Sequence, residues 1–394
     1  MQKILFYFQS NSAHMQRNER IAIVLTVLAV LAICFGYAYA SNDSGESEIE
    51  AKVLSFDAFG NAHFDLVMDD FRKIGADYGD DVRVTLGNQY VSAVLTVGYT
   101  GIACYEVFIV VGEDASMGAF NYDFLKMIEL EIGDVVTITK IGRNPYVDFI
   151  LKYQHNISMN RDDYPSDEAF GNYRMVDVGQ IEPDTLYRSA SPWKNGVRAE
   201  YVDNYYREQG VECLIGLDAD YDEIKKMVEE HPDYYVSELF RQGKVFCDLY
   251  KPKFHVNPEQ TKKFIEVYLQ TDGKVGIFCT QGKDRTGIFC MILEALGGAS
   301  YKEIKDEFGI TISNLYGIEK DTTEYMLVEN MYINRELYLF QHFDEIPNIP
   351  NLKWREVDFL PYDVEEVFTK YLIEYVGVEP EKVQAVKDKL KEGL

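Results

Sequence analysis

The sequence predicts an α/β fold in which a largely parallel sheet is flanked by helices and preceded by a small β-rich, barrel-like accessory domain. Between residues 165 and 394, short apolar runs alternate with helical patterns of ten or more residues, as in a parallel sheet. Between residues 51 and 155, alternating apolar runs are separated by glycine turns, which favours β-strands. With 394 residues, of which 47% are hydrophobic, the chain can bury two separate cores.

Residues 1–40 have the pattern of an export signal. A modestly basic flank precedes the uncharged apolar run 21–36, and Ala38-Tyr39-Ala40 follows it, as in a cleaved signal peptide. The run is also nearly long enough to act as an uncleaved membrane anchor. Both interpretations predict that the rest of the chain is exported, either secreted or anchored outside the cytoplasm. Residues 41–50 then read as a short acidic linker.

The β-rich domain is predicted over residues 51–155. Residues 82–86 alternate apolar and polar side chains, and residues 135–139 do so less strictly. The Phe56-x-x-Phe59-Gly60-Asn61 start and the Ile132-Gly133-Asp134 turn resemble the C-terminal barrel of S-adenosylmethionine hydroxide adenosyltransferase-like proteins. That resemblance implies a barrel fold and no activity, because the catalytic half of those proteins has no counterpart here.

The second domain is predicted over residues 165–394, after a linker around residues 161–165. A strand is expected at 211–217, a charged helix at 221–230 and a short strand at 244–250. Asn257-Pro258 has the residues that begin a helix, with a cap followed by proline. Two helices around Gly377 are expected to end the chain.

The charge and the cysteine pattern exclude several classes of function. A net charge of −26 repels nucleic acids and anionic membranes, so neither is expected as a general partner, and a membrane is expected only through the N-terminal segment. The six cysteines form no CxxC pair and no cluster with histidines. The sequence therefore predicts no metal and no cofactor.

Residues 274–298 carry the predicted chemistry. They read as an apolar strand, a polar loop and an apolar helix, with Cys279 and Arg285 six positions apart in the loop. Unpaired N–H groups and the dipole at the start of the helix favour an anion there. The planar guanidinium of Arg285 can hold two phosphate oxygens, and a thiolate at Cys279 would be the nucleophile. The predicted phosphate-binding residues are Thr280, Gln281, Gly282, Lys283, Asp284, Arg285 and Thr286.

The oxygen that leaves from phosphorus needs a proton, and two carboxyl groups are candidates to supply it. Asp284 lies within the loop itself. Asp248 lies 31 residues before Cys279, at the end of the predicted strand 244–250. The sequence leaves this choice open, with Asp248 as the alternative general acid.

The loop CTQGKDRTG at residues 279–287 resembles that of the cysteine-dependent protein tyrosine phosphatase superfamily, which reads Cys, five residues, Arg, then Ser or Thr. Its GKDRTG run is similar to the bacterial tyrosine/serine phosphatase branch, which has dual-specificity and phosphoinositide activities. Residues 172–179 and the LYRS segment at 186–189 resemble two other motifs of that branch. Two departures stand out: Phe278 replaces the usual His, and Leu217-Asp218 replaces Asp-Leu-Arg.

The resemblance implies a tyrosine-phosphatase-like sheet over residues 165–394, with Cys279 as nucleophile, Arg285 as phosphate clamp and Asp284 as the acid. We therefore expect an exported phosphatase that acts on phosphotyrosine-type protein monoesters. A phosphoinositide or inositol polyphosphate is the alternative substrate, because Lys283 adds a cation that suits a polyanion. A catalytically weak phosphate-binding module is the alternative from another class.

Overall fold

The computed structural model describes residues 47–57, 60–96, 107–112, 115–119, 128–144, 152, 157–247, 258–343 and 363–393. The chain divides into two units, residues 1–48 and 49–394. The predicted export signal at 1–40, Phe59 and Asp248 lie outside the described residues. Among the helices that are described, none is long and apolar enough to cross a bilayer.

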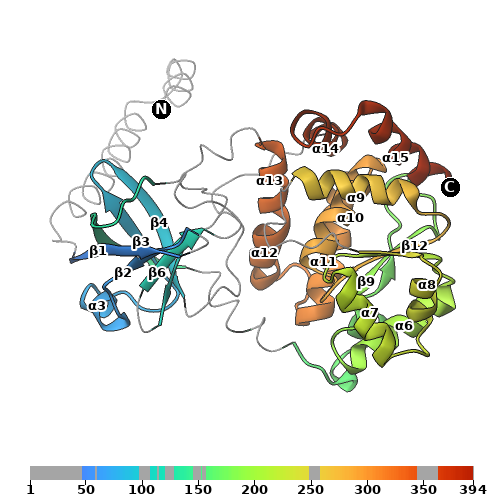
Figure 1. Ribbon diagram of the computed structural model, residues 1–394, viewed down its shortest axis with the longest axis horizontal. Helices are drawn as coiled ribbons and strands as arrows, with labels where there is room; N and C mark the ends of the chain where they lie inside the picture. The colour runs from blue at the N-terminus through green and yellow to red at the C-terminus, as the bar shows by residue number, and fades with distance from the viewer. Residues whose placement is uncertain are drawn as a thin grey trace, which may run out of the picture. The chain divides into compact units, whose positions relative to one another are not determined.

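The β-rich segment forms a closed barrel with strand order β1-β2-β6-β5-β4-β3-β7 (Figure 1). Its first strand begins at Glu48, inside the predicted linker 41–50. The predicted alternation at 82–86 is real, since Val82 and Val84 are buried in the barrel core whereas Arg83 faces solvent. The elements are β1 (Glu48–Phe56), β2 (Ala62–Phe64), α3 (Met68–Lys73), β3 (Asp80–Leu86), β4 (Gln89–Thr96), β5 (Val107–Val111), β6 (Ala115–Ala119) and β7 (Val135–Arg143).

The second part of the chain forms the predicted α/β sheet, with strand order β11-β10-β12-β9-β8. Strand β12 lies at its centre and pairs in parallel with both β10 and β9, and only β8 runs antiparallel. The strands are β8 (Arg174–Met175), β9 (Leu186–Ala190), β10 (Cys213–Gly216), β11 (Val245–Phe246) and β12 (Val275–Cys279).

Helices cover both faces of this sheet, as Figure 1 shows for α9 and α10 on one side of β12 and α6, α7 and α8 on the other. The helices are η3 (Arg161–Asp163), α5 (Asp167–Gly171), α6 (Val197–Gln209), α7 (Tyr221–Glu230), α8 (Tyr235–Arg241), α9 (Pro258–Gln270), α10 (Asp284–Leu296), α11 (Tyr301–Tyr316), α12 (Thr323–Glu329), η4 (Asn330–Asn334), α13 (Arg335–Gln341), α14 (Val364–Lys370), η7 (Tyr371–Tyr375) and α15 (Pro380–Glu392).

Because side chains alternate along a strand, β12 contributes to two different cores. Val275, Ile277 and Cys279 pack on the face covered by α9 and α10, in a core that continues into α11, α14 and α15. Phe278 points to the other face and packs under α6, α7 and α8. Phe278 is thus a core residue, whereas Cys279 is the last residue of the strand and is followed directly by the loop.

Candidate active site

Cys279 is the last residue of β12, and α10 begins five residues later at Asp284. The loop between them therefore lies where the carboxyl end of the central strand meets the N-terminus of a buried helix. Cys279 itself is only 4% exposed. This is the strand–loop–helix arrangement that the sequence predicts.

Gly282 lets the loop pack directly against the neighbouring strand β9. Its φ is +65°, and a Cβ atom there would lie 2.3 Å from the backbone oxygen of Ser189. No side chain fits in that space, and L-residues avoid that backbone conformation. Glycine at this position is therefore required by the close approach of loop and strand.

Three successive carbonyl groups of the loop are held from outside by other parts of the chain. The Thr280 oxygen accepts from the side-chain amide of Asn195 and from the Ser191 N–H. The Gln281 oxygen lies 3.0 Å from Nδ2 of Asn172.

The third carbonyl, of Gly282, accepts from Arg188 Nη2 at 3.0 Å. Since a peptide N–H points opposite to the carbonyl of the same plane, the N–H groups of Gln281 and Lys283 face away from these anchors. The anchors thereby leave two loop N–H groups directed away from the anchoring residues, as binding of an anion by the loop requires.

Arg285 lies in the first turn of α10 and is half-buried. Its Nη1 donates to the backbone oxygen of Leu217 at 2.7 Å, which ties it to the end of β10. The hydroxyl of Thr286 is buried and has no hydrogen-bond partner within the described residues. A buried hydroxyl without a partner is available to donate to an anion in the loop.

The Lys283 ammonium contacts two tyrosines beside the loop. Its side chain is buried, and Nζ donates to the hydroxyls of Tyr316 at 2.7 Å and Tyr332 at 2.9 Å. Burial alone would lower the pKa of Lys283, but Asp284 and the two tyrosines outweigh it and raise that pKa above its usual value. The ammonium is thus charged and directed at α11 and η4, and its contact with phosphate stays a prediction.

The two candidate acids are placed differently with respect to the loop. Asp284 is the first residue of α10; its side chain is 44% exposed and lies 3.5 Å from Lys283 Nζ. Asp248 lies outside the described residues. The identity of the general acid therefore stays a prediction.

Asp218 is a third carboxyl group beside the loop, and in the sequence it stands out only as a departure from the Asp-Leu-Arg motif. It follows β10, is buried, and its Oδ2 lies 3.2 Å from Thr280 Oγ1. Burial raises the pKa of Asp218, against the opposing effect of Lys194 and Arg285. A polar residue just after a strand that neighbours β12 is the signal that could have identified it, because parallel strands end at one edge of the sheet.

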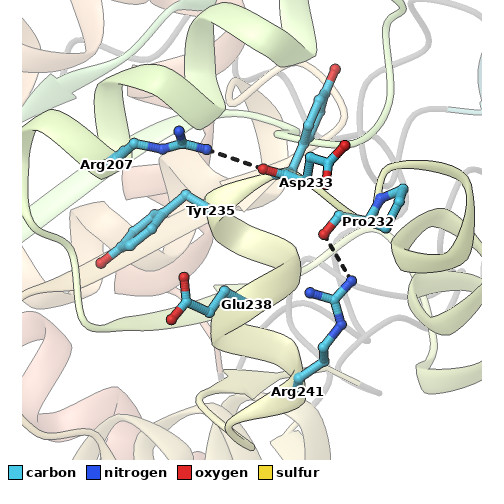
Figure 2. A pocket seen from close by; sticks show the side chains of 7 residues that line it. Arg207, Pro232, Asp233, Tyr235, Glu238 and Arg241 are labelled. Atoms are coloured by element: carbon cyan, nitrogen blue, oxygen red, sulfur yellow. Dashed lines mark hydrogen bonds between the residues drawn. The ribbon is translucent and has the colours of Figure 1, made fainter.

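A pocket elsewhere in the described part of the chain does not add to this site. It has a volume of about 500 Å³ and is lined by Arg207, Pro232, Asp233, Tyr234, Tyr235, Glu238 and Arg241 (Figure 2). Both arginines are used there to hold backbone oxygens, Arg207 that of Asp233 and Arg241 that of Pro232. No group of three or more His, Cys, Asp or Glu side chains in the described residues could hold a metal ion.

The C-terminal part of the chain is similar to known proteins. The sequence pattern of the tyrosine phosphatase family matches residues 169–392. A tyrosine-protein phosphatase of Nostoc commune is 39% identical over 70 residues, which cover 18% of this chain and 24% of that protein. The chain thus spans about a quarter of the length of this curated relative.

Two solved structures are weakly similar. The core catalytic domain of the PP-IP phosphatase SIW14 from S. cerevisiae, in complex with citrate, is 17% identical with a TM-score of 0.26; the match covers 44% of this chain and 93% of that one. An uncharacterized conserved protein from Thermotoga maritima is 21% identical with a TM-score of 0.22 and covers 23% of this chain and 36% of that one.

Proposed function

Because the chain belongs to the tyrosine phosphatase family, whose pattern covers residues 169–392, we propose that it hydrolyses phosphate monoesters of the phosphotyrosine type through a cysteinyl-phosphate intermediate. The observation that carries this proposal is the loop after Cys279, whose carbonyl groups are held outward by Asn172, Arg188 and Asn195. That arrangement prepares the N–H groups for a phosphate before any substrate arrives.

The reaction follows from the residues around the loop. The Cys279 thiolate attacks phosphorus, so that an S–P bond forms while the P–O bond to the leaving group breaks. Arg285 and the loop N–H groups hold the phosphoryl oxygens, and Asp284 or Asp248 gives its proton to the leaving oxygen. Water then attacks phosphorus and passes a proton to that carboxylate, the S–P bond breaks, and inorganic phosphate leaves.

A cysteine comparison tests the nucleophile. Cys279→Ser should abolish hydrolysis of p-nitrophenyl phosphate, whereas Cys213→Ser, at an equally buried cysteine on the adjacent strand β10, should retain it. Hydrolysis that survives Cys279→Ser would exclude the cysteinyl-phosphate mechanism. Tight vanadate binding without turnover in the wild type would instead favour the phosphate-binding module.

The acid is tested by pH–rate profiles of Asp284→Asn and Asp248→Asn. The variant that loses the basic limb of the profile identifies the group that must be protonated. If both variants keep that limb, neither residue is the acid.

The substrate is proposed to be a phosphotyrosine-type protein rather than an inositol polyphosphate. The additional cation that would suit a polyanion, Lys283, is engaged by Tyr316 and Tyr332. Rates on a phosphotyrosine peptide should therefore exceed those on inositol phosphates and phosphoinositides. The reverse order would favour the alternative substrate.

Export is proposed from the sequence of residues 1–40 alone. A mature N-terminus at Ser41 in the exported fraction supports a cleaved signal. An intact N-terminus in the membrane fraction supports an anchor, and an intact protein in the cytoplasm contradicts both.

A further inference from the structure

Arg188 is a fully buried cation beneath the phosphate loop. It lies on β9, opposite Ile277 of β12, and its side chain is 0% exposed. A buried charge without a partner is strongly unfavourable, so the groups that compensate Arg188 are informative.

The guanidinium of Arg188 connects the loop to α11. Nη2 donates to the Gly282 oxygen at 3.0 Å, and Nη1 lies 2.5 Å from Oε2 of Glu307. The other carboxylate oxygen of Glu307 accepts from Arg174 Nε at 2.7 Å. The helix start packs closely against this group, since a Cβ on Gly287 would lie 3.5 Å from Arg188 Nη2.

The buried cluster of Arg174, Arg188, Glu307 and Glu294 contains two arginines and two carboxyl groups. Burial raises the pKa of Glu294 well above its usual value, and the charge of Glu307 beside it adds to this, which favours the neutral form of Glu294. Burial would also raise the pKa of Glu307, but the two arginines outweigh it and lower that pKa, which favours the charged form of Glu307. The cluster therefore favours an excess of positive charge.

Cys279 lies beside this cluster. Arg188 pairs with Ile277, and Cys279 is two residues further along β12 on the same face of the sheet, so Arg188 and Cys279 are diagonal neighbours on adjacent strands. Cys290 and Glu294 of α10 and Glu307 of α11 are the other groups that face Arg188. Arg174 of β8 completes the set. The residue before the cysteine, Phe278, packs on the opposite face against Trp193 and carries no charge. The buried cluster thus supplies the positive charges of Arg188 on β9 and Arg174 on β8 on the face of the sheet where Cys279 lies.

We propose that Arg188 is a positioning residue for the phosphatase reaction: it holds the Gly282 carbonyl from beneath and supplies the positive charge that favours the Cys279 thiolate. This inference rests on the proposed function and adds the group that supports its nucleophile. Arg188 touches no substrate in this scheme. It acts by holding the loop backbone and through the electric field of its charge at the Cys279 sulfur.

A matched pair of buried arginines tests the proposal. Arg188→Met removes the charge under the loop, and Arg198→Met removes an equally buried arginine that stacks on Phe170 and lies on α6. The readout is the pH dependence of Cys279 alkylation by iodoacetamide, followed by mass spectrometry of the peptide that contains it. We expect Arg188→Met to move the midpoint upward by about one pH unit and Arg198→Met to leave it in place. Equal midpoints in the two variants would overturn the proposal.

Two further variants separate the effect of charge on the alkylation midpoint from the effect of a loss of structure. The double variant Glu294→Gln/Glu307→Gln removes both carboxyl groups, so that neither can take over the negative charge, and should move the midpoint downward, opposite to Arg188→Met. Loss of structure would move both midpoints in one direction. Arg188→Lys keeps the charge but loses the fork that holds both Gly282 and Glu307. It should keep the midpoint and lower kcat, and it serves as the decisive variant if Arg188→Met does not fold.

Failure of the Arg188 proposal can be distinguished from failure of the proposed function. If Cys279→Ser retains hydrolysis, the cysteine mechanism itself is wrong. If Cys279→Ser is inactive while neither Arg188 variant changes the alkylation profile or kcat, only the role of Arg188 is wrong.

Discussion

Nδ2 of Asn172 lies 3.0 Å from the backbone oxygen of Gln281, although 109 residues separate the two along the chain. Asn172 ends helix α5 with φ 45° and ψ 41°, a left-handed conformation that asparagine tolerates better than most residues. Its Oδ1 accepts from Arg174 and Asn314, which fixes the orientation of the amide. A helix end outside the loop thus controls the direction of a loop carbonyl.

We expect Asn172→Asp to lower kcat/KM about 10- to 100-fold, because a misplaced loop costs catalysis even when the fold survives. The substitution keeps the shape and the acceptor oxygen but replaces the donor that faces the Gln281 and Gly282 carbonyls. Asn172→Gly keeps the backbone conformation and should lose less, since it introduces no repulsion. Steady-state kinetics on an aryl phosphate decide this, and an unchanged kcat/KM in Asn172→Asp would contradict it.

Gly282→Ala should inactivate the protein and destabilise it by more than the cost of its backbone conformation. Gly75→Ala is the matched control, because Gly75 has φ +73° but no atom lies within 4 Å of the position that a Cβ would occupy there. The left-handed conformation costs roughly 1–2 kcal/mol in both variants. Only Gly282→Ala adds the clash with the Ser189 backbone. Urea unfolding of the two variants measures the difference, and equal losses would show that loop and strand can separate freely.

Lys283→Met should reduce stability by ~1–3 kcal/mol at neutral pH, since Tyr316 and Tyr332 lose their charged donor. The pKa of Lys283 is raised on folding, so its contribution is complete below the unfolded value of 10.5 and is lost as pH rises through the folded pKa. Urea unfolding between about pH 10 and 12 should therefore show a steeper loss in the wild type than in Lys283→Met, whereas the difference between the two should be constant below about pH 10. Parallel curves would contradict this.

The same variant separates a structural from a phosphate-binding role. If the Lys283 ammonium stays with the tyrosines, Lys283→Met should raise KM by a smaller factor than Arg285→Lys does. A larger effect of Lys283→Met would mean that the ammonium turns toward the bound phosphate.

Asp218→Asn should stabilise the protein at neutral pH. Burial raises the pKa of Asp218 above the usual 3.8, so the folded state keeps a proton that the unfolded chain has lost. Stability at this site therefore falls as pH rises from about 4 through the folded pKa, by about 1.4 kcal/mol for each unit of the shift. Urea unfolding should give equal stabilities for wild type and variant near pH 4 and a gain for the variant at pH 7. Glu294 also has a raised pKa, but it contributes the same pH dependence of stability to the wild type and to the variant. A gain in stability that is independent of pH would contradict the raised pKa of Asp218.

Much of the local structure follows from local sequence. The apolar run 275–279 and the apolar stretch after Asp284 directly predict β12 and α10, because a fully buried strand and helix are apolar throughout. The helix at 221–230 has the expected bounds, with Asp220 as its cap. The strand predicted at 244–250 agrees less well with the structure. Of the residues described there, 244–247, only Val245–Phe246 form β11.

The sequence alone was enough to predict the cysteine and arginine spacing, the strand–loop–helix at 274–298 and membership of the family, because each depends on residues close together in the chain. The three-dimensional arrangement was needed to show what stands behind the loop: Asn172 and Arg188 reach it from more than 90 residues away. It also shows that the Lys283 ammonium turns to Tyr316 and Tyr332 and that Phe278 faces the opposite core. Long side chains are directed by partners distant in sequence, and no local pattern encodes those partners.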